Sequence, residues 1–152
     1  MSFLYISKIW RITPMDDIKI RKAVVDDIKT IVLLLQKLDM FNYPDIDGET
    51  ALRRVLNNNN AIWLVAVKDA GVVGSVRGCW DGSRAIVHQL AIDKKYHHQG
   101  IGKLLVDSII QEFARLNIPT VSVTTTEKNR AFFEKRGFSK TEVFLMLKSL
   151  DT

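Results

Sequence analysis

The sequence predicts one domain of the α/β (α+β) class, a mixed β-sheet with helices packed on it. The chain has 152 residues, 47% apolar and 26% charged, which suits a single buried core and excludes disorder or a fibre. Strand-like and helix-like runs follow one another in the order β-α-α-β-β-β-α-β-α-β. With no repeat or linker, we expect one domain over residues 15–152, preceded by an extension of unknown role over residues 1–14.

The first half of this domain predicts a strand, two helices and a three-stranded meander. Residues 18–23 alternate as a short strand does. Asp26 or Asp27 is then expected to cap a helix with apolar positions at helical spacing up to Leu38, and residues 49–56 form a second helix. Two glycine-containing turns separate three antiparallel strands, over residues 62–67, 72–79 and 85–92.

The second half predicts a long amphipathic helix followed by a strand, a helix and a strand. Apolar residues recur over residues 101–116 with charged residues between them, and Pro119 ends this helix. The β-branched run over residues 120–125 predicts a strand, and residues 128–136 predict a helix that ends at Gly137. Residues 143–148 predict the last strand.

Composition excludes several classes of protein. The net charge of +5 favours acidic ligands but is too small to indicate a nucleic-acid partner. The single Cys79 excludes a disulfide framework and a four-cysteine metal site, which makes a reducing, cytoplasmic setting the expectation. No apolar run approaches the roughly 18 residues that a membrane span needs, and we expect no metal, since the adjacent His97 and His98 lack a third ligand.

A glycine turn between a strand and a helix is the most informative feature. The strand over residues 86–92 leads to the His-His-Gln-Gly turn at residues 97–100 and to a helix that carries Gly102. Such a turn leaves backbone N–H groups unpaired at the positive end of a helix, where phosphate binds. No Ser or Thr follows Lys103 as a P-loop requires, and Leu105 replaces the third glycine of a dinucleotide fingerprint.

Two motifs together resemble the GNAT N-acetyltransferase superfamily. They are the strand over residues 90–92 with the His-x-x-Gly-x-Gly turn after it, and the sequence Phe-Phe-Glu-Lys-Arg-Gly-Phe at residues 132–138. The resemblance covers nearly the whole chain from about Ile18 onward. It implies a splayed, mixed sheet of six or seven strands with about four helices, and acetyl-coenzyme A as acyl donor.

The resemblance also implies which residues bind the cofactor. Backbone N–H groups at residues 99–103 would hold the pyrophosphate, and the strand edge at residues 90–92 would pair with the pantetheine arm as another strand does. A backbone N–H at Leu90 or Ala91 would stabilise the oxyanion, so Leu90 is predicted to be a catalytic residue as well as a cofactor-binding residue. The predicted cofactor-binding residues are Leu90, Ala91, Ile92, His97, His98, Gln99, Gly100, Ile101, Gly102, Lys103, Asn129, Phe132 and Phe133.

Two positions depart from the family pattern. His97 stands where Arg or Gln is usual, which would make cofactor binding more sensitive to pH. Phe133 stands where the family often has a tyrosine that protonates the departing thiolate. A thiol with a pKa near 8.5 leaves as thiolate at a cost of about 2 kcal/mol at most, so water can protonate it. Relatives that resemble acetylglutamate synthases also lack this tyrosine and share the Thr-Thr strand end found at residues 124–125.

The acceptor amine needs a base, because an ammonium with a pKa near 10.4 costs about 4 to 5 kcal/mol to deprotonate at neutral pH. His88 is the predicted base or water relay, against a packed histidine bonded to a neighbouring strand. Strand alternation puts Gln89 on the opposite face, and Asp81 and Glu142 are the alternative bases. Cys79 is expected to be a small core residue rather than an acyl carrier.

The acceptor itself is constrained only by the stretch over residues 39–50. It carries Asp39, Asp45, Asp47 and Glu49 without Lys or Arg, which suits a cationic amine or describes an ordinary acidic surface. We therefore expect direct acetyl transfer to a small-molecule or amino-acid-like amine. A non-catalytic acetyl-coenzyme A binding module and a protein or peptide N-terminal acetyltransferase remain the alternatives. No nucleic acid or membrane is expected as a partner, and a homodimer is left open.

Overall fold

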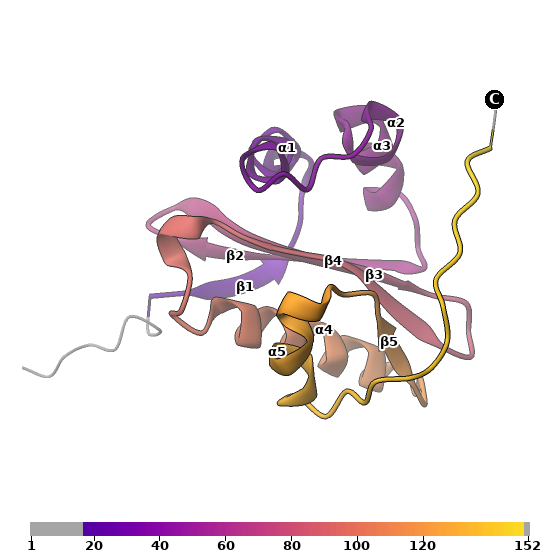
Figure 1. The fold of residues 1–152 in the computed structure, drawn as a ribbon. Helices are drawn as coiled ribbons and strands as arrows, with labels where there is room; N and C mark the ends of the chain where they lie inside the picture. Colours follow the sequence, from indigo (N-terminus) through magenta and orange to yellow (C-terminus); the bar gives the residue numbers. More distant parts are fainter. Residues whose placement is uncertain (1–16, 151–152) are drawn as a thin grey trace, which may run out of the picture.

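The computed structural model describes residues 17–150, and the predicted extension over residues 1–14 lies outside this range. A five-stranded sheet forms the centre, in the order β1-β2-β3-β4-β5, with helices on both faces (Figure 1). The first four strands are antiparallel, while β4 and β5 are parallel, so the sheet is mixed as predicted. The strands are β1 Lys19–Lys22, β2 Ala61–Lys68, β3 Gly71–Trp80, β4 Ala85–Ile92 and β5 Val121–Val123.

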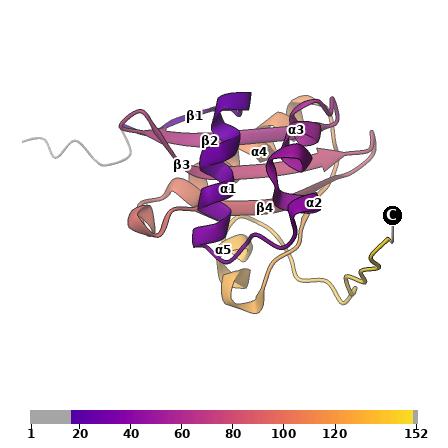
Figure 2. The same cartoon turned by 90° about the horizontal axis from the view of Figure 1, so that it is seen from above.

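The helices form two layers, with α1, α2 and α3 on one face of the sheet and α4 and α5 on the other (Figures 1 and 2). Their bounds are α1 Ile28–Lys37, α2 Pro44–Asp47, α3 Glu49–Leu56, α4 Ile101–Arg115 and α5 Arg130–Glu134. The single turn α2 was not predicted; it begins with a proline at its first position, where the missing N–H costs nothing.

The start of α1 differs in detail from the expected cap. Asp27 stands at the N-cap position, but its carboxylate does not bond to the first turn of α1. It accepts the backbone N–H of Val24 at 2.8 Å and two N–H groups of Arg21 at 2.7 and 2.9 Å. The Arg21 hydrogen bonds are the main reason that the pKa of Asp27 is lowered, so this carboxylate joins β1 to α1 as an anion.

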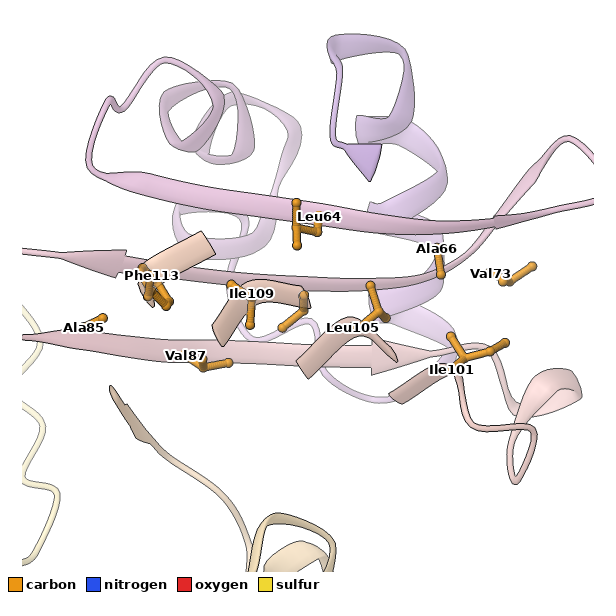
Figure 3. Packing of buried hydrophobic residues seen from close by; sticks show 10 residues of the cluster. Leu64, Ala66, Val73, Ala85, Val87, Ile101, Leu105, Ile109 and Phe113 are labelled. Carbon is orange, nitrogen blue, oxygen red and sulfur yellow. The ribbon is translucent and has the colours of Figure 1, made fainter. Parts of the chain in front are cut away.

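Two apolar clusters, one on each face, hold the layers together. The cluster under α4 is drawn in Figure 3 and contains Leu64, Ala66, Val73, Val76, Ala85, Val87, Ile101, Leu105, Ile109 and Phe113. The cluster under α1 and α3 contains Ile28, Ile31, Leu34, Leu35, Leu52, Trp63, Val65 and Ala91. Alternate strand residues enter opposite clusters, which is the pattern of a sheet buried on both faces.

The last predicted strand, over residues 143–148, does not form, and the prediction of six or seven strands is wrong for the described residues. This stretch has no regular structure and no ladder partner among residues 17–150. A run of apolar and β-branched residues becomes a strand only when it pairs with a neighbour. The strand predicted over residues 120–125 is likewise reduced to the three residues that pair with β4.

Candidate functional site

The sheet opens between β4 and β5. The two strands pair only at Ala85, Ile86 and Val87, and no other strand among residues 17–150 pairs with this side of β4 beyond that point. The backbone N–H of Asp93 donates to Val73 on the opposite side, at 2.9 Å. Because successive residues direct their backbone groups to opposite sides, Leu90 and Ile92 face the opening. The second half of β4 therefore presents a strand edge that a ligand can pair with.

His97 ties the glycine turn to this edge. Its Nε2 atom lies 2.8 Å from the carbonyl oxygen of Ile92, so Nε2–H donates a hydrogen bond to the strand end. The neutral Nε2–H form and the charged form can both make this bond. The structure thus gives His97 a role in holding the turn against the end of β4.

The turn leads directly into α4 through two left-handed residues. His98 has a φ of 61° and Gly100 a φ of 81°, and the Gly100 carbonyl accepts the N–H of Leu104 at 3.1 Å. The N–H groups of the first helical turn have no acceptor within a helix. Among residues 17–150, the N–H groups of residues 99–103 donate to no other part of the chain, so they are available to an acceptor from outside it.

The side chains around the start of α4 are less cationic than the sequence suggests. Lys103 is paired with Asp107, with Nζ and Oδ2 2.8 Å apart, and His98 is exposed. Gln99 carries a buried Oε1 atom that has no hydrogen-bond partner. An anion bound here would therefore depend mainly on backbone N–H groups and the helix dipole.

Gly102 is the point where β4, α4 and α5 meet. A Cβ atom on Gly102 would lie 2.8 Å from Ile92 Cδ1 and 3.3 Å from Phe132 Cζ. Gly102 thus packs closely against Ile92 and Phe132, two other predicted cofactor-binding residues that are far from each other in sequence. A residue without a side chain is needed here for close packing of the helix start, in addition to the predicted role of its N–H group in binding the pyrophosphate.

The two aromatic residues of α5 have different surroundings. Phe132 lies over Gly102 and stacks with the Arg136 guanidinium, 3.8 Å from the ring centroid. Phe133 is only 6% exposed and packs edge-to-face against Phe132 and Phe138. Asn129 is exposed just before α5, where its N–H donates to Thr126. Phe133 is therefore a packing residue as well as the residue that replaces the expected tyrosine.

A β-bulge reshapes the middle of β4. Arg77 pairs with Gln89 and Gly78 with Val87, which leaves His88 as the extra residue. Gln89 and Arg77 both donate to Asp47, so they lie on the same face of the sheet. His88 contacts Cys79, which is two residues after Arg77 on β3 and therefore on that face as well. The prediction that Gln89 points to the opposite face from His88 is wrong, because the bulge interrupts the alternation on which it relied.

His88 is exposed and is held by one contact from β3. Its Nε2 atom lies 3.2 Å from the Sγ atom of Cys79. Partial burial of the ring, and secondly the positive charge of Arg77, lower the pKa of His88 from 6.5. The imidazole is therefore neutral at neutral pH, and when Nε2–H donates to Cys79 the Nδ1 atom is left to accept a proton.

Cys79 has the properties of a protonated thiol. Burial raises its pKa, with Arg77 acting in the opposite direction and Asp81 in the same direction. A protonated thiol is a weak nucleophile, which agrees with the expectation that Cys79 is not an acyl carrier. Its contact with His88 was not anticipated from the sequence.

Asp47 is not part of the acidic surface that the sequence suggested for residues 39–50. It is 1% exposed, and its Oδ1 atom lies 3.1 Å from Arg77 Nη2 and 3.3 Å from Gln89 Nε2. Its Oδ2 atom accepts the backbone N–H of Asn42 at 2.9 Å. Asp47 is thus committed to a buried cluster that anchors α2 to the sheet, and it is not free to bind a cationic acceptor.

The alternative bases are less suitable than His88. Asp81 accepts the N–H groups of Ser83 and Arg84 at 2.8 and 3.0 Å, and these bonds lower its pKa. A carboxylate stabilised in this way accepts a proton poorly. Glu142 is exposed on the C-terminal stretch that lacks regular structure.

Residues 17–150 show neither a cluster of metal ligands nor a helix that could span a membrane. No three His, Cys, Asp or Glu side chains in this range come together as metal ligands would. None of the helices in the same range has the length and apolar character needed to cross a membrane.

Comparison with known families and proteins gives consistent matches. Residues 59–140, more than half of the chain, match the model of the family described as the acetyltransferase (GNAT) domain. An acetyltransferase of Yersinia pestis is 27% identical over 135 residues, which cover 87% of this chain and 95% of that protein.

Solved structures share the fold. The PaiA N-acetyltransferase of Thermoplasma acidophilum, in complex with coenzyme A, has a TM-score of 0.73 at 18% identity; the match covers 84% of this chain and 92% of that one. An aminoglycoside acetyltransferase from an uncultured soil metagenomic sample, in complex with sisomicin, has a TM-score of 0.73 at 22% identity. That match covers 90% of this chain and 99% of the acetyltransferase.

Proposed function

The chain belongs to the acetyltransferase (GNAT) family, and from this premise we propose that it is an acetyl-coenzyme A dependent N-acetyltransferase that acts on a small-molecule or amino-acid-like amine. The observation that carries this proposal is the unpaired edge of β4 near the N–H groups at the start of α4, which have no acceptor among residues 17–150. Bound there, acetyl-coenzyme A would supply the activated acetyl group as a thioester.

The residues present fit this cofactor. A pantetheine arm carries amide groups, which pair with a strand edge such as that of Leu90 and Ile92. The Ile92 carbonyl already accepts from His97, so the N–H of Ile92 and the backbone groups of Leu90 are the free positions. A diphosphate suits the N–H groups at the start of α4, next to the strand end that Gly102 contacts.

Leu90 and His88 take the two chemical roles in this proposal. The N–H of Leu90 faces the opening and would donate to the thioester oxygen, where negative charge develops during transfer. His88, two residues earlier, would accept the proton of the acceptor ammonium at Nδ1, directly or through water. Two observations support this assignment: His88 is the first residue of β4 beyond its pairing with β5, and its side chain is exposed.

The site would otherwise contribute to catalysis by positioning the amine and the thioester. Since no side chain here forms an acyl-enzyme in this scheme, rate acceleration comes from holding the amine next to the thioester. Phe133 has no proton to give, so water would protonate the departing thiolate, at a cost of about 2 kcal/mol at most. The phenylalanine at position 133 also favours a second candidate function, a module that binds acetyl-coenzyme A without turnover.

The nature of the acceptor is proposed from the layer formed by α2 and α3. Asp39, Asp45 and Glu49 remain exposed after Asp47 is committed to Arg77, and they would attract a cationic amine. The paired aromatics with the Thr-Thr strand end at residues 124–125 favour an amino-acid-like acceptor by their resemblance to acetylglutamate synthases.

Two measurements on the same preparation test the proposal. Isothermal titration calorimetry with acetyl-coenzyme A measures binding, and thiol release is then followed across polyamines, aminoglycosides, amino acids and peptides with free N-termini. We expect binding, with release above hydrolysis for at least one small amine. Binding without release for any amine would support the binding module, release with peptides alone would support the peptide acetyltransferase, and no binding would reject both the enzyme and the module.

A further inference from the structure

Asp47 joins the layer formed by α2 and α3 to the strand that carries His88. It is the last residue of α2, which lies over β3 and β4 (Figure 2), and it is only 1% exposed. Its Oδ1 atom accepts hydrogen bonds from Arg77 Nη2 on β3 at 3.1 Å and from Gln89 Nε2 on β4 at 3.3 Å. One carboxylate thus connects α2 with two neighbouring strands of the sheet.

The stability of the fold does not by itself account for this ion pair. A buried ion pair is often no more stabilising than well-packed apolar residues of the same volume, because both charges lose their hydration. The pair of Asp47 and Arg77 carries a further cost, since the Nε atom of Arg77 is buried and has no hydrogen-bond partner among residues 17–150. A charged pair with such a cost indicates a role beyond packing.

The charge of Arg77 lies close to the imidazole of His88. Arg77 and Cys79 are two residues apart on β3, so their side chains leave the same face of the strand about 7 Å apart. The Sγ atom of Cys79 lies 3.2 Å from His88 Nε2, and Gln89, the residue after His88, shares the Asp47 carboxylate with Arg77. A charge at this range acts within the Debye length of about 8–10 Å, and solvent screens it less because Arg77 is only 12% exposed.

The charged and titratable groups around His88 in the described chain come from three elements. They are Arg77 and Cys79 on β3, Asp47 on α2 behind Arg77, and Asp81 in the turn between β3 and β4. Burial, and secondly the charge of Arg77, lower the pKa of His88, whereas burial raises the pKa of the Cys79 thiol and keeps it uncharged at neutral pH. Arg77 is therefore the group whose charge acts on the imidazole, and Asp47 is the group that offsets this charge.

We propose that Asp47 is a positioning residue for His88: its carboxylate compensates the charge of Arg77 and holds Gln89, and through these contacts it keeps the neighbouring imidazole fit to accept a proton. This role rests on the proposed function in one respect, that His88 is the base. A base works best when its pKa lies near the working pH. An uncompensated Arg77 would make His88 a weaker base, whereas loss of Arg77 would leave more of the imidazole already protonated.

Titration of the His88 imidazole by nuclear magnetic resonance tests the proposal on the full chain, without cofactor or acceptor. The chain has three histidines, and His88→Gln identifies the resonance of His88. The variants are Asp47→Asn, Arg77→Met and the double variant with both changes. The matched control, Asp45→Asn, removes a carboxylate from an exposed position of the same helix.

The expected shifts have opposite signs, which a general loss of structure would not produce. We expect the pKa of His88 to fall by at least about 0.5 in Asp47→Asn, to rise by at least about 0.5 in Arg77→Met, and to change by less than about 0.2 in Asp45→Asn. In the double variant it should lie between the values of the wild type and Arg77→Met. Equal values in the wild type and Asp47→Asn, or an equally large fall in Asp45→Asn, would overturn the proposal.

Circular dichroism verifies that each variant is folded, because removal of one partner of a buried pair is destabilising. If Asp47→Asn does not fold, Arg77→Met and the double variant decide: the pKa of His88 must be higher in Arg77→Met, where the Asp47 carboxylate is uncompensated, and equal values would overturn the proposal.

Kinetics with an accepted amine distinguishes this proposal from the proposed function. The acidic limb of kcat/KM against pH should move to lower pH in Asp47→Asn, together with the pKa of His88. Turnover whose pH profile does not respond to Asp47→Asn would reject the positioning role and leave the proposed function standing. The expected pKa shifts in a chain that releases no thiol with any amine would support the link between Asp47 and His88 and reject the proposed function.

Discussion

Replacement of His88 by glutamine provides the sharpest test of the proposed proton acceptor. Glutamine keeps a polar group near Cys79 Sγ, which lies 3.2 Å from the imidazole, but it cannot take a proton from the amine. Deprotonation of the amine costs about 4 to 5 kcal/mol at neutral pH, and a positioned base contributes typically about 10²- to 10⁴-fold to the rate. We expect kcat/KM to fall at least about 100-fold at neutral pH, with the affinity for coenzyme A unchanged.

The pKa of His88 determines how the loss of kcat/KM in the His88→Gln variant changes with pH. Burial and Arg77 lower the pKa of His88 below its ordinary 6.5, so the base is active at neutral pH and becomes protonated only in more acidic solution. The ratio of wild-type to variant kcat/KM should therefore increase as pH rises through the lowered pKa and then stay constant. Steady-state kinetics with Asp81→Asn as the control measure this, because Asp81 is the exposed alternative base. A ratio near one, or one that does not change with pH, would refute the role of His88.

Three further outcomes are expected. Gly102→Ala should already weaken coenzyme A binding in calorimetry, because a Cβ atom 2.8 Å from Ile92 Cδ1 and 3.3 Å from Phe132 Cζ displaces the start of α4. Gly102→Val should weaken it further through its two additional methyl groups, and wild-type affinity in both variants would contradict this. Asp47→Asn should lower the free energy of unfolding by about 3–5 kcal/mol in denaturant titrations, because Arg77 is then buried without its charge partner. A second change in the same chain, Arg77→Met, should restore part of the lost free energy of unfolding. Phe133→Tyr should not raise turnover and should lower the melting temperature, because its hydroxyl enters a 6% exposed site; faster thiol release would show that a side-chain acid was missing.

Elements with strong local signals were predicted well from the sequence. The predicted bounds of α3 and β4, residues 49–56 and 85–92, coincide with those in the structure. In both cases the periodicity is clear, and asparagines or glycine turns stop the element. The opening of the helix after Gly100 was also located correctly, since a glycine in the left-handed region fixes it.

The cluster around His88 could not be predicted in the same way. A bulge adds one residue without changing the apolar pattern, so alternation misplaces Gln89 relative to His88. Asp47 contacts Arg77 and Gln89, which follow it by 30 and 42 residues, and nothing local distinguishes it from its acidic neighbours. Arg77 itself carried a signal, because an arginine inside an otherwise apolar strand requires a buried partner.

The missing last strand has a different cause. Its residues have the right composition, but a strand also needs a neighbour to pair with. In the described part of the chain β5 pairs with β4 alone, and residues 143–148 remain exposed beside no strand. Composition reports what a segment can form, whereas pairing is decided by tertiary or quaternary contacts.

The central claim is that the open edge of β4 and the first turn of α4 bind acetyl-coenzyme A. Amide chemical shifts and hydrogen exchange, measured by nuclear magnetic resonance with and without coenzyme A, test it directly. The claim predicts that the N–H groups of Leu90, Ile92, Gly102 and Lys103 shift and become protected, while that of Asp93, already bonded to Val73, does not. Saturating coenzyme A that leaves these four amides unchanged, or that protects amides elsewhere in the chain, would contradict it.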